Sequence, residues 1–246
     1  TALQVTDDAT PNNPNDHLIR LVYNNGVAID VSGLSGPPAG WDNGITWNRE
    51  HSWPQDRGVS STSPPDGTDL HHLLPSFNSD NSERGNLNFG GAFGAQSRGQ
   101  VNDGGLKYYP GNMDAGLIAR AQFYMAVRYD GADSGTVDLE LASGNPATGG
   151  TTLGDLNRLI EWHFAVPPDA FERRRNQVIY DNYQGNRNPF VDHPEYAWSI
   201  FVNQANNSQL SIVGGSLNGD GSSVRNVDLG RVFVGAAVPA AQVERA

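Results

Sequence analysis

Segments with a regular hydrophobic pattern are unevenly distributed along the chain, and this limits the folds that it can adopt. Residues 46–105 are rich in Gly, Ser, Asn and Asp and have few periodic segments, which predicts loops. Helical spacing of apolar residues is found over 114–129, 153–164 and 167–185. With 29 glycines and 15 prolines, the chain suits a loop-rich domain better than a helical bundle. We therefore expect a mixed α+β fold.

Residues that begin or end helices support these assignments. Asp114 is placed to cap the first helix, while Pro168 and Asp169 open the third and Gly185 lies beyond its end. Upstream, residues 17–30 predict a short helix or strand, an Asn-Asn-Gly turn and a second strand.

The composition restricts the chemistry available to the chain. There is no cysteine, so disulfides and thiolate metal sites are excluded, and any metal must bind to oxygen or imidazole. The net charge is −11, with one lysine and fifteen arginines, which disfavours loose, charge-driven binding to DNA. A polyanion would have to be bound by a local cluster of arginines or through a metal.

The organisation of the chain gives further expectations. Residues 1–200 are expected to form one domain and residues 201–246 a strand-rich tail that could begin an appended module. No apolar run is long enough to span a membrane, so no membrane partner is expected. Because the sequence starts at Thr1 rather than Met, we expect that a leader was removed and that the protein is a secreted or periplasmic monomer.

The residues that suggest chemistry lie in the loop-rich part. The stretch "TWNREHSWPQDRG", residues 46–58, places Arg49, Glu50 and His51 between two tryptophans. Downstream, "DLHHLLPS" contributes Asp69, His71 and His72, and Ser76 is predicted to cap a helix that Gly85 ends. On that helix Asn81 and Arg84 are three residues apart and share a face.

These residue types suit phosphodiester hydrolysis. An imidazole such as His51 can deprotonate water near neutral pH, and Mg²⁺ is bound by one or two carboxylate or amide oxygens together with waters. Glu50 and Asn81 supply such oxygens. Structural interpretations stay open, because His51 could be packed by its tryptophan neighbours, Glu50 could form a surface ion pair with Arg49, and Asn81 could only solvate a helix.

Several ungapped motifs, in the same order, carry a family resemblance. "NREHSWP", "GTDLHHLLPS" and "NSERGNLNFGG", followed by "IARAQFYMAVRY" and "FERRRNQVIYDNYQGNRNPFVDHPE", resemble the endonuclease I family of bacterial, mostly exported nucleases. The resemblance covers roughly residues 15–200.

The resemblance implies a ββα-metal (His-Me finger) motif that binds one Mg²⁺, with Mn²⁺ or Ca²⁺ as substitutes. It also implies sequence-non-specific cleavage of DNA, and of RNA, that leaves 5′-phosphate ends. By position, Glu50 and Asn81 match the metal ligands and His51 matches the general base. A local bend is expected at Glu50 and His51, because neighbours in a regular strand point to opposite faces.

The sequence departs from the family pattern at two places. Better-known members have a glutamate where this chain has Gly67, and they place a phosphate-binding arginine in a longer loop. The corresponding loop here is short and contains only Arg57, so Arg57 or Arg84 is the candidate for that catalytic role. Arg49, Arg173 and Arg174 are candidates for substrate binding.

Two other functions are compatible with the sequence. One is a zinc-dependent hydrolase that uses His51, His71 and His72, since three histidines are a common ligand set for catalytic zinc. The other is a catalytically silent surface or carbohydrate-binding module, which the tryptophans, tyrosines and Gly-rich loops would suit.

Overall fold

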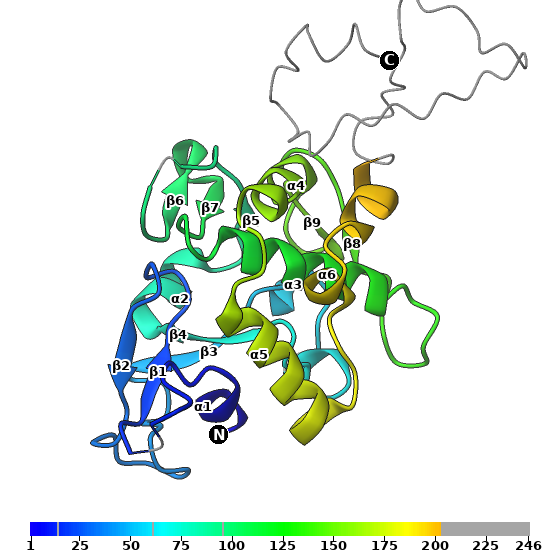
Figure 1. Ribbon diagram of the computed structural model, residues 1–246. Helices are drawn as coiled ribbons and strands as arrows, with labels where there is room; N and C mark the ends of the chain where they lie inside the picture. Colours follow the sequence, from blue (N-terminus) through cyan, green and yellow to red (C-terminus); the bar gives the residue numbers. More distant parts are fainter. Residues whose placement is uncertain (14, 61, 95, 203–246) are drawn as a thin grey trace, which may run out of the picture.

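The computed structural model describes residues 1–13, 15–60, 62–94 and 96–202, and it has both helices and short strands, which confirms the α+β prediction (Figure 1). Almost all of the predicted tail, residues 203–246, lies outside the described residues. The proposed division between a domain and a tail stays a prediction.

The helices are α1 (Ala2–Thr6), α2 (Asn78–Arg84), α3 (Ala115–Arg128), α4 (Leu156–Ala165), α5 (Ala170–Ile179) and α6 (Pro189–Asp192). The 3₁₀ turns are η1 (Gln55–Arg57), η2 (Asp66–Thr68) and η3 (Asp103–Gly105), and the π turns are η4 (Tyr180–Gln184) and η5 (Trp198–Val202). The strands are β1 (Leu18–Arg20), β2 (Ala28–Asp30), β3 (Trp47–His51), β4 (Leu73–Phe77), β5 (Asn88–Phe89), β6 (Gln100–Asn102), β7 (Lys107–Tyr109), β8 (Glu140–Leu141) and β9 (Thr152–Leu153).

The strands form small, separate sheets rather than one large sheet. The pairs β1–β2 and β3–β4 are antiparallel, and β8–β9 is parallel. In the remaining sheet, β7 lies between β5, which is parallel to it, and β6, which is antiparallel. In the described part of the chain, no sheet has more than three strands.

The central element is α3, which crosses the middle of the molecule (Figure 1). Every residue from Ala115 to Met125 is buried, and α3 contacts α4, α6 and β8. The helix prediction over 114–129 is confirmed, but this helix is buried on all sides over three turns rather than on one stripe. Its two buried polar residues, Arg120 and Gln122, are hydrogen-bonded to Glu172 and Ser52.

A second, smaller core lies between α1, β1 and β3. Leu3, Ile19 and Trp47 pack in it, together with Leu73 and Ile179. Both tryptophans that flank the Arg-Glu-His triplet are fully buried, so they anchor β3 and the turn that follows it.

The first residues of the chain dock on α5. The Nη2 atom of Arg174 donates to the backbone carbonyl of Thr6, and Nε of Arg175 donates to Oδ1 of Asp7 at 2.8 Å. These arginines therefore hold α1 against a helix that follows it by more than 160 residues in the sequence.

Most local predictions agree with the structure. Residues 17–30 form the β1–β2 hairpin, and α4 begins at Leu156, within the segment 153–164. The third helix begins after its N-cap Asp169, and the helical segment ends at Gly185 in a left-handed conformation. Asp114 occupies the N-cap position of α3, although its carboxylate binds Tyr23 N and Arg20 instead of the helix.

One prediction is wrong: Ser76 does not cap α2. It lies in β4 opposite Asn48, and the helix begins two residues later, at Asn78. The reason is that pairing with β3 continues as far as Phe77, opposite Trp47, so the backbone is still extended at Ser76. The predicted end of the helix, at Gly85, is confirmed.

None of the helices in the described ranges is long and apolar enough to cross a membrane.

Candidate active site

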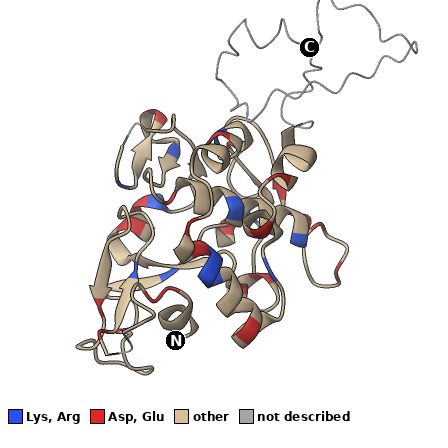
Figure 2. Ribbon diagram, in the orientation of Figure 1, with Lys and Arg blue, Asp and Glu red and all other residues tan. Residues whose placement is uncertain are grey.

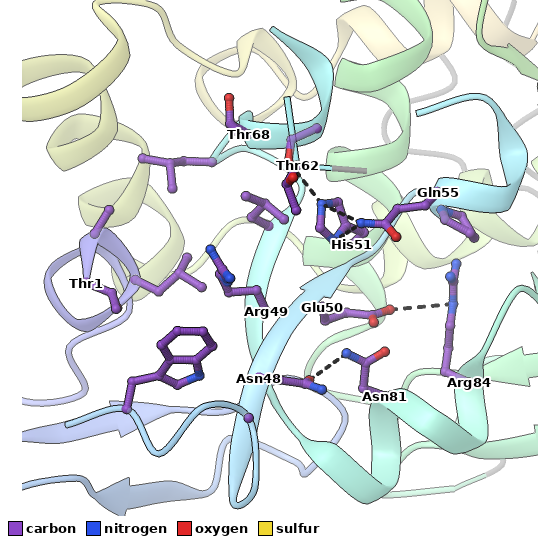
Figure 3. A pocket seen from close by; sticks show the side chains of 18 of the residues that line it. Thr1, Asn48, Arg49, Glu50, His51, Gln55, Thr62, Thr68, Asn81 and Arg84 are labelled. Atoms are coloured by element: carbon purple, nitrogen blue, oxygen red, sulfur yellow. Dashed lines mark hydrogen bonds and ion pairs between the residues drawn. The ribbon is translucent and has the colours of Figure 1, made fainter. Parts of the chain in front are cut away.

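The strands β3 and β4 and the helix α2 follow one another and bring five of the predicted residues, Arg49 among them, to one cavity. Glu50 pairs with Leu74 and His51 with Leu73 across the two strands, and α2 leaves the end of β4. Glu50, His51, Asn81 and Arg84 all line a cavity of about 640 Å³ (Figure 3). Its wall also includes Thr1, Leu3, Trp41, Asn48, Arg49 and Gly67.

Glu50 is buried, and its two carboxylate oxygens have different surroundings. The Tyr23 hydroxyl donates to Oε1 at 2.7 Å, and Nε of Arg84 lies 3.6 Å from the same oxygen. Within the described structure nothing donates to Oε2. Burial raises the pKa of Glu50 to about 7, against the opposing effects of Arg84 and the Tyr23 hydrogen bond. Glu50 therefore has one anchored oxygen and one oxygen available to a cation.

Asn81 is oriented in a comparable way. Its amide Nδ2 donates to Oδ1 of Asn48 at 2.6 Å, and Asn48 in turn donates to Oδ1 of Asn78 at 3.1 Å. This fixes the amide of Asn81 and leaves its Oδ1 without a donor in the described part of the chain. In Figure 3, Asn81 and Glu50 lie on the same side of β3. A carboxylate oxygen and an amide oxygen are hard donors that fit Mg²⁺, which keeps several waters as its other ligands.

His51 lies at the end of β3, and its ring orientation is set by the backbone. Its Nε2 atom is 3.0 Å from the carbonyl oxygen of Gly67. Because a carbonyl can only accept, Nε2 carries the proton of the neutral ring and Nδ1 carries the lone pair, with Nε2 of Gln55 3.5 Å away as a long donor. Burial lowers the pKa of His51, and the nearby Arg49 acts in the same direction. The neutral ring, which can accept a proton, therefore predominates at neutral pH.

The structure gives a reason for glycine at position 67. A β carbon there would lie 1.9 Å from the carbonyl oxygen of Ser60, so the loop that contains Ser60 leaves no room for a side chain. The residue instead contributes its own carbonyl to His51. The departure from the family pattern at Gly67 thus coincides with close approach of two backbone segments.

Arg84 is almost completely buried, and two nitrogens of its guanidinium donate hydrogen bonds to backbone carbonyls. Its Nη1 donates to the carbonyl of Gly85 at 2.9 Å and its Nη2 to that of Ser52 at 2.6 Å, while the plane lies 4.6 Å from the ring centre of Phe89. Only Nε points towards Glu50 without a hydrogen-bond partner. This arrangement holds a fixed positive charge beside the carboxylate.

The other predicted arginines differ in position. Arg57 is buried outside the cavity wall, where it donates to the carbonyls of Asn86 and Thr152 at 2.9 and 2.7 Å. Arg173 and Arg174 lie on α5, bound to backbone carbonyls, and do not line the cavity either. Arg49 does line it, is exposed, and stacks on Trp41.

The three histidines of the zinc alternative do not form one ligand set in the described part of the chain, although the rings of His51 and His72 are in edge contact, with 5.4 Å between their centres. His71 Nε2 lies 3.3 Å from the carbonyl of Asn186 and His72 Nε2 2.8 Å from that of Asp66, and neither ring lines the cavity of His51. Among the residues that the structure describes, no group of three or more His, Cys, Asp or Glu side chains could hold a metal. The arrangement therefore gives no support to a histidine zinc centre.

Sequence reasoning missed two residues that orient Glu50 and Asn81. Asn48 could have been found, because residues two apart on a strand share a face and Asn48 thus lies on the side of Glu50. Tyr23, which is 27 residues from Glu50, has no local signal.

Comparisons with known proteins agree with the motifs. The family model described as Endonuclease I matches residues 3–195. The chain is 43% identical over 205 residues to a protein named extracellular ribonuclease from Bacillus subtilis (strain 168), and 40% identical over 205 residues to one of the same name from Bacillus amyloliquefaciens. Each match covers 81% of this chain and 66% of the relative, so the chain spans about two thirds of the length of these relatives.

Proposed function

Because the chain belongs to the endonuclease I family, we propose that it is a metal-dependent endonuclease that hydrolyses phosphodiester bonds in nucleic acids. The observation that carries this proposal is that Glu50, Asn81 and His51 all line one cavity. We propose that it acts on DNA and RNA without sequence specificity and leaves 5′-phosphate ends. The names of its two Bacillus relatives support action on RNA and export from the cell.

Glu50 and Asn81 would hold the metal, which we propose to be Mg²⁺, with Mn²⁺ or Ca²⁺ as possible substitutes. When bound, the ion supplies positive charge that neutralises the phosphate and the leaving oxygen. Two protein ligands are few, but Mg²⁺ commonly binds through one or two protein oxygens together with substrate phosphate.

His51 is the proposed general base. Its Nδ1 takes a proton from a water molecule while the water oxygen forms a bond to phosphorus. The bond from phosphorus to the 3′ oxygen breaks, and this oxygen takes a proton from solvent. The products are a 5′-phosphate and a 3′-hydroxyl. The Gly67 carbonyl keeps the ring in the tautomer that this step requires.

Arg84 and Tyr23 are proposed to act through Glu50. Both contact Oε1, so they hold the carboxylate in one orientation and favour its ionised form. Because its two Nη atoms are occupied by carbonyls, we assign Arg84 to positioning rather than to phosphate contact. We assign Arg57, Arg173 and Arg174 to holding loops and helices together.

The central test compares Glu50→Ala with His51→Ala. Glu50→Ala should weaken Mg²⁺ binding measured by calorimetry, and high Mg²⁺ should recover part of its activity. His51→Ala should bind Mg²⁺ as the wild type does, yet cleave plasmid DNA and RNA about 10²–10⁴-fold more slowly. His193→Ala is the control, because His193 is an exposed histidine whose partner is Glu195.

Two results would reject this proposal. One is a reversal of the two roles, with metal binding lost in His51→Ala and kept in Glu50→Ala. The other is full wild-type activity in excess EDTA, because removal of the ion should abolish cleavage and added Mg²⁺ or Mn²⁺ should restore it.

A further inference from the structure

Arg49 differs from every other arginine in the described ranges of the chain. The others are bound either to a carboxylate or to backbone carbonyls: Arg20, Arg98, Arg120, Arg128, Arg158, Arg175 and Arg187 belong to the first group, and Arg57, Arg84, Arg173 and Arg174 to the second. Arg49 alone among them makes no hydrogen bond or ion pair. Its N–H donors are therefore free for a ligand.

Although it has no polar partner, the Arg49 guanidinium is held in place. Its Cζ lies 4.7 Å from the ring centre of Trp41. Trp41 is itself packed against the apolar cluster that contains Leu3 and Trp47. Stacking on a fixed aromatic ring restricts the guanidinium without using its in-plane donors. A planar cation held in this way is suited to bidentate contact with phosphate.

The position of Arg49 relates this cation to the proposed catalytic centre. Both Arg49 and Glu50 line the cavity, but as neighbours on β3 they project to opposite sides of the strand. In Figure 3, Glu50 points towards Arg84 and Asn81, whereas Arg49 lies on the side of Thr1. An anion at Arg49 would thus lie in the same cavity as the scissile phosphate and be separated from it by the width of the strand.

The charge distribution of the chain makes a local cation such as Arg49 important for binding a polyanion. The net charge of the chain is −11, and Figure 2 shows basic and acidic positions interspersed over the described elements. A diffuse basic surface therefore cannot guide the polyanion, and local contacts must do so.

We propose that Arg49, held by Trp41, forms a second anion subsite that binds a phosphate flanking the scissile one. This inference rests on the proposed nuclease function and specifies its substrate: a nucleotide chain with at least two phosphodiester linkages is bound better than an isolated one.

The test uses thymidine trinucleotides, which contain two linkages. One form has both linkages natural, and in each of two others one linkage is a neutral methylphosphonate. The rate of cleavage at the remaining natural linkage is compared with its rate in the fully natural form. For the wild type, one of the two replacements should reduce this rate by roughly ten- to hundredfold, the usual effect of a charge-assisted hydrogen bond. In Arg49→Ala the same replacement should have almost no effect.

Further variants separate charge from geometry. Arg49→Lys keeps the charge without the planar fork and should retain part of the effect. Trp41→Leu keeps an apolar side chain but removes the aromatic face, and it should also reduce the effect. Arg158→Ala is the matched control, since Arg158 is partly exposed on α4, paired with Glu161, and does not line the cavity.

The outcomes distinguish this inference from the proposed function. A wild-type enzyme that is indifferent to both methylphosphonates, or an Arg49→Ala enzyme with the wild-type ratio, would overturn the subsite while leaving the nuclease function intact. Failure of the wild type to cleave any nucleic acid with Mg²⁺ would overturn both. If trinucleotide turnover is too slow to follow, the same ratios are read from trinucleotide affinities for the His51→Ala protein, and the same outcomes apply.

Discussion

Two buried carboxylates, Glu50 on β3 and Asp69 in the segment that joins β3 to β4, differ in their surroundings. Both are nearly inaccessible to solvent. Among the described residues, Glu50 has hydrogen-bond donors only at Oε1, and it faces the cavity. Asp69 lies outside the cavity wall, in contact with α3 and with the end of the η4 turn.

Asp69 has donors at both oxygens. Oδ2 accepts from the hydroxyls of Tyr124 and Tyr129 at 2.7 and 2.8 Å, and Oδ1 accepts from His71 N and Gln184 Nε2 at 2.9 and 3.0 Å. Burial alone would raise its pKa, but His71, the Gln184 hydrogen bond and the other donors outweigh burial and lower the pKa of Asp69.

The difference shows how one fold assigns different tasks to the same chemical group. A carboxylate with all its lone pairs occupied stabilises the fold and has no capacity for a ligand. A buried carboxylate with one oxygen that has no hydrogen-bond donor is costly to ionise in the metal-free protein, and the pKa of Glu50 is raised to about 7. A bound cation would remove this cost, so the unsatisfied oxygen favours metal binding.

The largest expected effect on activity follows from replacing the unsatisfied carboxylate. Glu50→Gln should reduce the rate of cleavage by about 10²–10⁴-fold, since it removes a charged metal ligand worth several kcal/mol. Its free energy of unfolding in EDTA should be at least that of the wild type, because the ionised Glu50 is disfavoured at neutral pH. Nuclease assays and urea unfolding measure the two quantities. A marked loss of stability would place Glu50 in the structural class with Asp69.

The converse change should affect stability instead. Asp69→Asn leaves donors from two tyrosines and Gln184 with fewer acceptors, so we expect the free energy of unfolding to fall by about 2–4 kcal/mol. Mg²⁺ affinity of the folded protein should change little. The control Asp133→Asn removes an exposed aspartate paired with Arg128 and should cost less than about 0.5 kcal/mol. Equal losses in both variants would contradict the structural role of Asp69.

A finer comparison removes one tyrosine hydroxyl that donates to each carboxylate. Tyr23→Phe should lower Mg²⁺ affinity by about 10–100-fold, because the hydroxyl orients a metal ligand. Tyr129→Phe should cost about 1 kcal/mol of stability and leave Mg²⁺ affinity unchanged, since Tyr124 still donates to Asp69. Calorimetric Mg²⁺ titrations of both variants test this, and a Tyr23→Phe protein with wild-type affinity would show that Glu50 needs no such support.

The smallest expected effect is the dependence of metal affinity on pH. With the pKa of Glu50 raised to about 7, protons compete with Mg²⁺, and the affinity for Mg²⁺ should fall about fivefold between pH 7 and pH 6.

The dependence of folding stability on pH has opposite signs at the two carboxylates. Without metal, the contribution of Glu50 is present at low pH and lost as pH rises through about 7. The contribution of Asp69, whose pKa is lowered, is lost only in acid. Mg²⁺ titrations at several pH values and unfolding in EDTA measure both, and a pH-independent affinity would contradict the raised pKa.

Much of this site was accessible from the sequence because its signals are local. The Glu-His pair and the spacing of Asn81 and Arg84 on a helix predict residues that do line one cavity. The helix ends at Asp169 and Gly185 follow from capping chemistry, which depends on a few neighbouring residues.

What the sequence could not provide depends on contacts between distant segments. The start of α2 was misplaced because pairing with β3, not the local preference of Ser76, decides where β4 ends. The same applies to the partners of Arg57 and Arg84, which are backbone carbonyls that carry no sequence signature. A bend was expected between Glu50 and His51, whereas β3 pairs with β4 in unbroken register from Trp47 to His51 and both residues line the cavity.

The docking of α1 on α5 has a consequence for the order in which parts of the molecule fold. Ala2 and Leu3 form part of the cavity wall, and Arg174 and Arg175 hold this segment in place. A ribosome produces α1 long before it reaches α5, and loops of this length close late during folding. A nascent chain therefore carries Glu50, His51 and Asn81 well before it has a complete cavity around them. The finished pocket arises only after translation has passed residue 175.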